Sequence, residues 1–188
     1  MKQNKIKFTL YTFIAFFCIA LLFPFAANAQ RRDQLSEMES ELVREAQEID
    51  RRTEIFVKAI DRRFLVLNND TSQSKKVEKD FEKWGELPKG TRTQLLMDIE
   101  KILEEAISKI DDVAAHDIKN DLLPKAVHTL ADASAKFLPQ LKSQLDKTNT
   151  DVEKGAILGA IDSCNQIIEA SAKVPKEESK KKKKKDNS

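Results

Sequence analysis

The chain has 188 residues, of which 34% are charged, 40% are hydrophobic and 6% are aromatic. It contains only 4 glycines and 5 prolines, which excludes a β-sandwich or β-barrel built on frequent Gly and Pro turns. The net charge of +2 conceals three unlike regions. Residues 1–29 carry three lysines and no acid, residues 30–172 carry 22 basic and 28 acidic residues, and residues 173–188 carry eight lysines and three acids. An acidic body therefore lies between two basic ends.

Residues 1–29 have the pattern of a bacterial-type secretory signal peptide. Three lysines precede an almost wholly apolar run at 8–25. Ala27 and Ala29 supply the small residues that signal peptidase requires, so cleavage would leave Gln30 as the new N-terminus. We therefore expect an exported protein, either periplasmic or secreted. The apolar run is about as long as a membrane span, which leaves an uncleaved membrane anchor as the alternative.

The segment 34–68 predicts one long helix, because it contains no Gly or Pro. Its apolar residues recur every seven positions, as in a coiled coil, at Leu35, Leu42, Ile49 and Phe56. At about 1.5 Å per residue such a helix would be about 50 Å long, which exceeds the later helices. Three arrangements would accommodate this length: a bend near Arg52 and Thr53, cover by the next short helix, or projection toward a second copy.

The tetrapeptide Ile-Asp-Arg-Arg occurs at 49–52 and again at 60–63, which is three helical turns further along. In one continuous helix Arg51 and Arg62 would share a face and could grip a phosphate or a carboxylate. Acidic residues lie within one turn of each arginine. We therefore expect a solvated face whose charges pair with one another.

Four further helices follow, and the first of them is short and covers about 75–85. The second follows Thr91 and Gln94, which have the form of a capping box. The third begins near Pro124, since proline suits the first turn of a helix. Pro139 falls inside this third helix and predicts a kink or a restart there.

The last helix opens at a second capping box, Thr150 with Glu153. Gly155 and Gly159 stand four residues apart on it, a spacing that predicts close packing against another helix of the same chain. The expected fold is all-α. It is an antiparallel helical bundle of four main helices and one short helix, and it occupies residues 30–172 as a single domain.

Two carboxylate and imidazole pairs are the candidate metal ligands: Asp112 with His116, and His128 with Asp132. Each pair has a four-residue spacing, and the two lie on consecutive helices that could bring them together across a turn. The sequence lacks the Glu-x-x-His pattern of di-iron bundles, and it lacks His-Glu-x-x-His and Cys-x-x-Cys. We therefore expect solvated or capping histidines and no cofactor.

Beyond the first 29 residues the chain has one cysteine, Cys164, and it lies on the apolar stripe of the last helix. We expect its side chain to be buried. No serine stands in a Gly-x-Ser-x-Gly turn, and no glycine-rich loop could hold a phosphate. The sequence therefore indicates a protein that is not an enzyme.

The segment 173–188 contains an unbroken run of six lysines and predicts a disordered polybasic tail. These lysines are the candidate residues for binding an anionic surface: Lys180, Lys181, Lys182, Lys183, Lys184 and Lys185. An anionic membrane or a cell-wall polymer fits this charge. Specific binding of nucleic acid is not expected, because the signal peptide would carry the chain out of the cytoplasm.

Together these features favour a noncatalytic exported bundle, in the cell envelope or secreted. It would bind a protein partner, or associate with itself, through a helix face, with the basic tail as an electrostatic tether. One alternative is a periplasmic carrier of a small ligand or metal. Another is a chaperone-like binder of unfolded chains.

Overall fold

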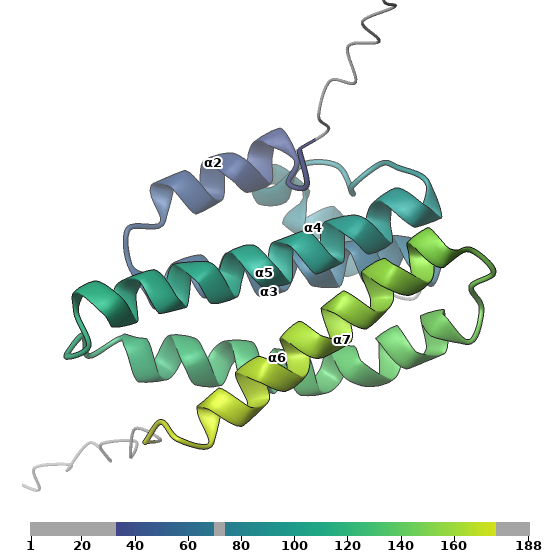
Figure 1. Cartoon of the computed structure of the whole chain (residues 1–188). Coiled ribbons are helices and arrows are strands. Elements are labelled where there is room, and N and C mark those ends of the chain that lie inside the picture. Colours follow the sequence, from purple (N-terminus) through teal and green to yellow (C-terminus); the bar gives the residue numbers. More distant parts are fainter. Residues whose placement is uncertain (1–32, 70–73, 176–188) are drawn as a thin grey trace, which may run out of the picture. The chain divides into compact units, whose positions relative to one another are not determined.

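The computed structural model describes residues 33–69 and 74–175, and these residues belong to one compact unit. The described part of the chain is all-helical, with six helices and no strand (Figure 1). The expected signal peptide at 1–29 and the lysine run at 180–185 lie outside the described residues.

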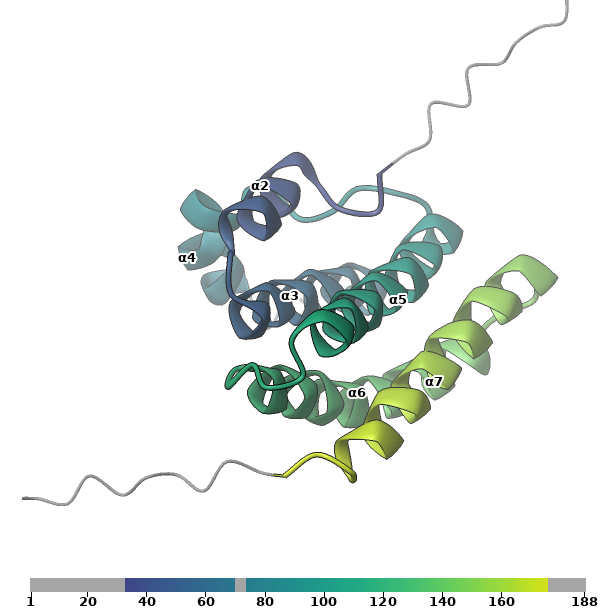
Figure 2. The same cartoon turned by 60° about the vertical axis from the view of Figure 1, so that its left-hand side comes forward.

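Four helices form an antiparallel bundle, and each runs opposite to the bundle helix before it (Figures 1 and 2). They are α3 (Ile49–Leu67), α5 (Arg92–His116), α6 (Leu123–Leu145) and α7 (Asp151–Ser171). Helices α3 and α7 each pack against both α5 and α6, so the four close into a ring around one core. The expected antiparallel bundle of four main helices is therefore present.

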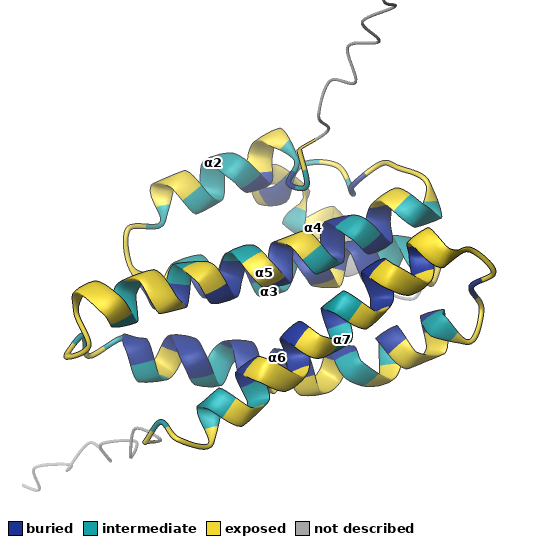
Figure 3. Cartoon of the chain, in the orientation of Figure 1, coloured by how far each residue is buried: buried dark blue, intermediate teal, exposed yellow. Residues whose placement is uncertain are grey.

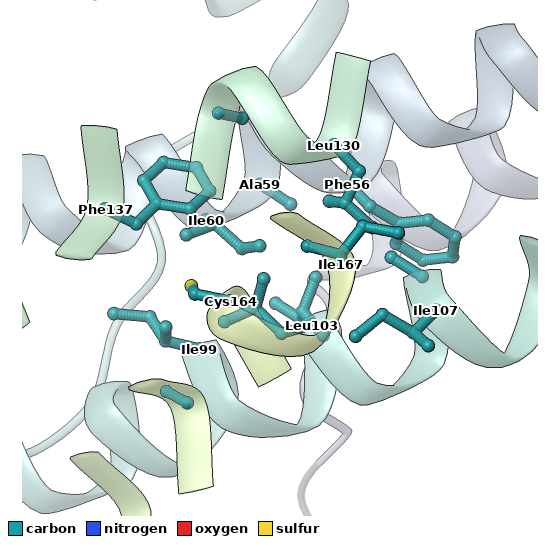
Figure 4. Packing of buried hydrophobic residues seen from close by; sticks show 14 of the residues in the cluster. Phe56, Ala59, Ile60, Ile99, Leu103, Ile107, Leu130, Phe137, Cys164 and Ile167 are labelled. Carbon is teal, nitrogen blue, oxygen red and sulfur yellow. The ribbon is translucent and has the colours of Figure 1, made fainter. Parts of the chain in front are cut away.

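Each bundle helix directs an apolar stripe toward this core, while its outer side is exposed (Figure 3). Figure 4 shows the centre of the core, where all four helices contribute side chains. Among them are Phe56 of α3, Leu103 of α5, Phe137 of α6 and Cys164 of α7, all almost wholly buried. The rings of Phe64 and Phe137 lie 5.6 Å apart between centroids and join α3 to α6.

Two short helices lie outside the ring, where one was expected. They are α2 (Glu37–Glu45), which packs on α3, and α4 (Ser74–Trp84), which packs on α2. The expected single helix over 34–68 is therefore wrong, because the chain is not helical between Glu45 and Ile49. Helix α2 turns back over the outer side of α3 and runs in the opposite direction (Figure 1).

The break lies at 46–48, several residues before the expected bend near Arg52 and Thr53. Ala46 has an extended backbone. The guanidinium of Arg52 donates to the Ala46 carbonyl twice, at 3.1 Å and 2.8 Å, and so occupies an acceptor at the end of α2. The break also removes the expected excess length of the first helix over the later ones. Helix α3 has 19 residues, and the other bundle helices have 21 to 25.

The helix ends follow the expected caps in part. Thr91 and Gln94 form a complete capping box at the start of α5. At the start of α7, Thr150 accepts a hydrogen bond from the Glu153 backbone at 3.3 Å, whereas the Glu153 carboxylate turns to other partners. Pro139 lies inside an unbroken α6, so the helix does not restart there.

The two glycines of α7 lie in different surroundings. A Cβ at Gly155 would meet no atom within 4 Å, so the expected close packing is wrong at this position. A Cβ at Gly159 would press on the carboxylate of Glu100 from α5, with the carboxylate carbon at 3.0 Å. A neighbouring helix therefore contributes a side-chain contact at Gly159, whereas Gly155 faces open space.

This difference predicts opposite outcomes for two matched substitutions. Gly155→Ala is expected to raise the free energy of unfolding by about 1 kcal/mol, because alanine favours the helix and its methyl group meets nothing. Gly159→Ala is expected to gain much less, because the Glu100 side chain must move away from the new Cβ. Urea unfolding of both variants measures the two values, and an equal gain would mean that the Glu100 side chain moves aside without cost.

Candidate functional site

The two candidate metal pairs lie near the surface. His116 Nδ1 lies 3.3 Å from Asp112 Oδ1 and 2.8 Å from the Asp112 carbonyl oxygen, and both residues are exposed. His128 Nε2 lies 3.0 Å from the carbonyl oxygen of Val174, while Asp132 is exposed on the same helix. Within residues 33–69 and 74–175, no three His, Cys, Asp or Glu side chains gather as a metal site would require.

The thiol of Cys164 is free and buried, as the apolar stripe predicts. Burial raises its pKa to about 11, although the nearby Ser134 hydroxyl acts in the opposite direction. The group therefore stays a neutral thiol at physiological pH, whereas a nucleophilic cysteine needs a thiolate. Figure 4 shows it among the apolar side chains of the core.

A buried cluster of charged residues lies where α2 meets α3. It begins with a capping box at the start of α2: the Glu39 backbone donates to Ser36 Oγ at 3.3 Å, and the Ser36 backbone donates to Glu39 Oε2 at 2.9 Å. This box points the Glu39 carboxylate toward α3. There it accepts from Arg62 Nε at 3.1 Å and from two nitrogens of Arg63 at 3.1 Å and 2.9 Å.

We call Glu39, Arg62, Arg63 and Asp98 the Glu39 cluster. The residue exposures are 0% for Glu39, 2% for Arg62 and 1% for Arg63. The expected solvated arginine face is therefore wrong at Arg62, because the break at 46–48 folds Glu39 back over α3. Arg63 Nε also lies 3.7 Å from Asp98 Oδ2, so two cations face two carboxylates from α2 and α5.

The remaining donors of Arg62 hold the end of α4. Arg62 donates to the carbonyls of Trp84 at 3.1 Å and of Gly85 at 3.2 Å, and also to that of Glu86. Its guanidinium carbon lies 5.8 Å from the centre of the Trp84 ring, within the range of a cation–π contact. Arg63 in turn donates to the carbonyl of Gln34, just before α2. The Glu39 cluster therefore fastens both outer helices to the bundle.

The charges of the Glu39 cluster stabilise each other. Burial alone would raise the pKa of Glu39, but the hydrogen bond and the charge of Arg63, the Ser36 amide and the charge of Arg62 together hold it below its ordinary value. Burial lowers the pKa of Arg62, and Glu39 opposes that effect. The carboxylate is therefore ionised at neutral pH and balances the arginines.

A second polar network joins the bundle helices at another point, around Glu153. Its carboxylate accepts from Arg92 Nε at 3.2 Å, from Thr93 Oγ1 at 2.8 Å, and from Thr148. The hydroxyls of Thr148 and Thr93 and the charge of Arg92 lower the pKa of Glu153. Arg92 also donates to the Gln144 carbonyl at 3.0 Å. The start of α5 is thereby tied to the end of α6 and the start of α7.

A shallow hollow of about 420 Å³ lies along α7. It is lined by Asp162, Asn165, Gln166, Glu169, Ala170 and Lys173. One helix and Lys173 just after it supply this lining, whereas small-ligand sites enclose most of the ligand surface within a concave and mainly apolar wall. The hollow therefore lacks the walls that would enclose a small ligand.

The fold and its polar networks define an all-α helical-bundle protein. Of the helices in the described ranges, none combines the length and the apolar character needed to cross a membrane. No family model, curated protein or solved structure matches this chain.

One residue of the Glu39 cluster, Glu39, has a local sequence signal. Ser36 and Glu39 have the Ser-x-x-Glu spacing of a capping box, which marks the start of a helix. The seven-residue apolar repeat of 34–68 continues past this signal, so spacing alone does not separate α2 from α3. The pairing of Glu39 with Arg62 had no local signal, since 23 residues separate them in the sequence.

Proposed function

We propose that the protein is a noncatalytic, exported helical bundle that acts by binding, with its lysine run as an electrostatic tether to an anionic envelope surface. The observation that carries this proposal is the charge contrast within one chain. Residues 30–172 carry 28 acidic and 22 basic residues, whereas 173–188 carry eight lysines and three acids. An acidic body would not approach an anionic surface by itself, so the attraction depends on the lysines.

The polar networks of the bundle support a binding role. The charged side chains of the Glu39 cluster, and those around Glu153, bond helices to one another. This is the role of a scaffold. Enzymes need polar groups that can reach a substrate, commonly on loops. The exposed outer faces of the helices are then the surfaces available for a partner.

The root of the lysine segment is fixed to the bundle. The His128 ring on α6 bonds to the Val174 carbonyl at 3.0 Å, and the Val174 side chain packs against the core. The lysine run begins five residues after Pro175. At about 3.3 Å per residue, the first lysine of the run can lie at most about 20 Å from Val174. A surface that binds these lysines would therefore hold the bundle close to it.

Deleting residues 176–188 is expected to abolish co-sedimentation with vesicles that contain anionic lipid. Each lysine near such a surface contributes about 1 kcal/mol, so the run supplies most of the attraction. For the unaltered protein, purified without residues 1–29, binding should fall steeply from low to high salt, because salt screens exposed charges.

Two length-matched variants serve as controls. Replacing all six lysines of the run with glutamine should remove binding, while replacing them with arginine should retain it, because the tether needs charge and not a particular sequence. The proposal would be wrong if the deletion left vesicle binding unchanged, or if binding to these vesicles did not respond to salt.

A further inference from the structure

Local sequence and tertiary structure disagree at residues 46–48. The tripeptide there is Ala-Gln-Glu, and all three residues are strong helix formers. The seven-residue spacing of apolar residues also continues across the break, from Leu42 to Ile49. Nothing in the local sequence requires the chain to leave the helix here. The break is therefore imposed by the contacts that α2 makes with the rest of the molecule.

These contacts are few and come from one surface. Arg52 donates to the Ala46 carbonyl, and the Glu39 cluster holds the first turn of α2 against α3. Helix α2 packs on α3 and α4, and it lies outside the ring of bundle helices. The surface that receives α2 would accept the same helix from a second copy equally well.

A continuous helix would separate the cluster. Glu39 and Arg62 are 23 residues apart, which is about 34 Å along a helix at about 1.5 Å per residue. The two buried arginines would then lose their main carboxylate partner, which is strongly unfavourable. Two open copies can restore both clusters at once, because each supplies the α2 that the other lacks.

We propose that α2 is an exchangeable arm: opening at 46–48 allows two copies of this chain to swap α2 and form a two-fold dimer. In the dimer, Glu39 of each copy pairs with Arg62 and Arg63 of the other copy, and 34–68 becomes the continuous helix that its sequence favours. This inference rests on the proposed binding function and names its partner as a second copy. The structure described above, in which α2 packs on α3 of its own chain, is the closed monomer in equilibrium with this dimer.

A pair of introduced cysteines distinguishes the closed monomer from the swapped dimer. Met38 Cβ lies 3.6 Å from a Cβ built at Gly85, within the range of a disulfide. In Met38→Cys/Gly85→Cys the closed form gives a cross-link within one chain, whereas the swapped form joins two chains through the same local geometry. After oxidation of protein refolded at high concentration, we expect covalent dimers on non-reducing electrophoresis. Cross-links found only within single chains would overturn the exchange.

Two hinge variants test the proposal without altering Gly85, whose positive φ of 64° makes a new side chain there unfavourable. Arg52→Ala removes the cap on the end of α2 and should raise the dimer fraction, with an association constant about tenfold higher. Gln47→Pro should abolish the dimer, because proline opposes a continuous helix, while Ala46 already has the extended backbone that precedes proline.

Light scattering after size-exclusion chromatography measures the fraction of dimer in both hinge variants and in the unaltered protein. Equal dimer fractions in all three would overturn the proposal. These measurements use no anionic surface. Failure of the exchange would therefore leave the lysine tether intact, and loss of vesicle binding would leave the exchange intact.

Discussion

Glu39→Ala is expected to lower the free energy of unfolding by about 3–5 kcal/mol. Glu39 accepts from Arg62 and from two nitrogens of Arg63, and all three side chains are buried. Removing the carboxylate leaves two buried cations, with Asp98 still 3.7 Å from Arg63. Removing one partner of a buried ion pair costs about 3–5 kcal/mol of stability, because the remaining charge is buried without an opposite charge beside it. Urea unfolding followed by circular dichroism measures the change.

Glu41→Ala is the matched control on the same helix. Glu41 pairs with Arg44 at the surface, where an ion pair contributes at most about 1 kcal/mol. The triple variant Glu39→Leu/Arg62→Met/Arg63→Met should recover much of the stability lost in Glu39→Ala, since a buried ion pair can often be replaced by apolar side chains. A cost below about 1 kcal/mol for Glu39→Ala would contradict the role of the cluster in fastening α2.

The same cluster gives stability a defined dependence on pH. The pKa of Glu39 in the folded protein lies below its ordinary value of 4.5. Its contribution is therefore fully present above that value and is lost as pH falls through the folded pKa. Glu153 and Asp50 have lowered pKa values and act in the same direction. In Glu39→Gln, unfolding free energy should decline less between neutral and acid pH than in the unaltered protein.

The bundle could be predicted from the sequence, because the spacing of apolar residues along a helix indicates directly which residues are buried. In α5, Leu96, Ile99 and Leu103 follow one another at spacings of three and four residues, and all three are at most 1% exposed. Cys164 was placed in the core by the same argument, and that prediction is confirmed. Spacing of three and four residues fixes which side of a helix faces inward, without knowledge of its partners.

The break between α2 and α3 could not be found in this way. Helix propensity and the seven-residue repeat both favour a continuous 34–68, while the break is held by contacts between residues distant in sequence. The burial of Arg62 was missed for the same reason. An arginine with acids nearby in sequence is normally solvated, and only the return of α2 brings Glu39 onto it.

The functional candidates were less well determined than the fold. The signal peptide at 1–29 and the lysines at 180–185 lie outside the described residues and stay predictions. His116 and His128, each with its aspartate, could share a metal only if the two pairs lay close together across the turn between their helices. The four-residue spacing within each pair does not fix that distance. In the structure the His128 ring bonds to the chain after α7, a contact across 46 residues without local signal.

Phe137→Ala is expected to cost about 3–5 kcal/mol of unfolding free energy. Phe137 is 1% exposed at the centre of α6, and its ring stacks at a tilt of 33° on Phe64 of α3. Truncation would remove this contact and leave a cavity between two bundle helices, which a packed core fills only in part. Phe81→Ala is the matched control, because Phe81 is 53% exposed on α4 and should change stability by less than about 0.5 kcal/mol.

Comparing the two phenylalanine variants tests which of the two rings lies in the core. A large cost at Phe137 with a negligible cost at Phe81 is the result expected for one ring in the bundle core and one at the surface, and it leaves Phe81 available for contact. Equal costs at both positions would contradict the described core, because they would require Phe81 to be buried in the folded protein. Urea unfolding of both variants under the same conditions decides between these outcomes.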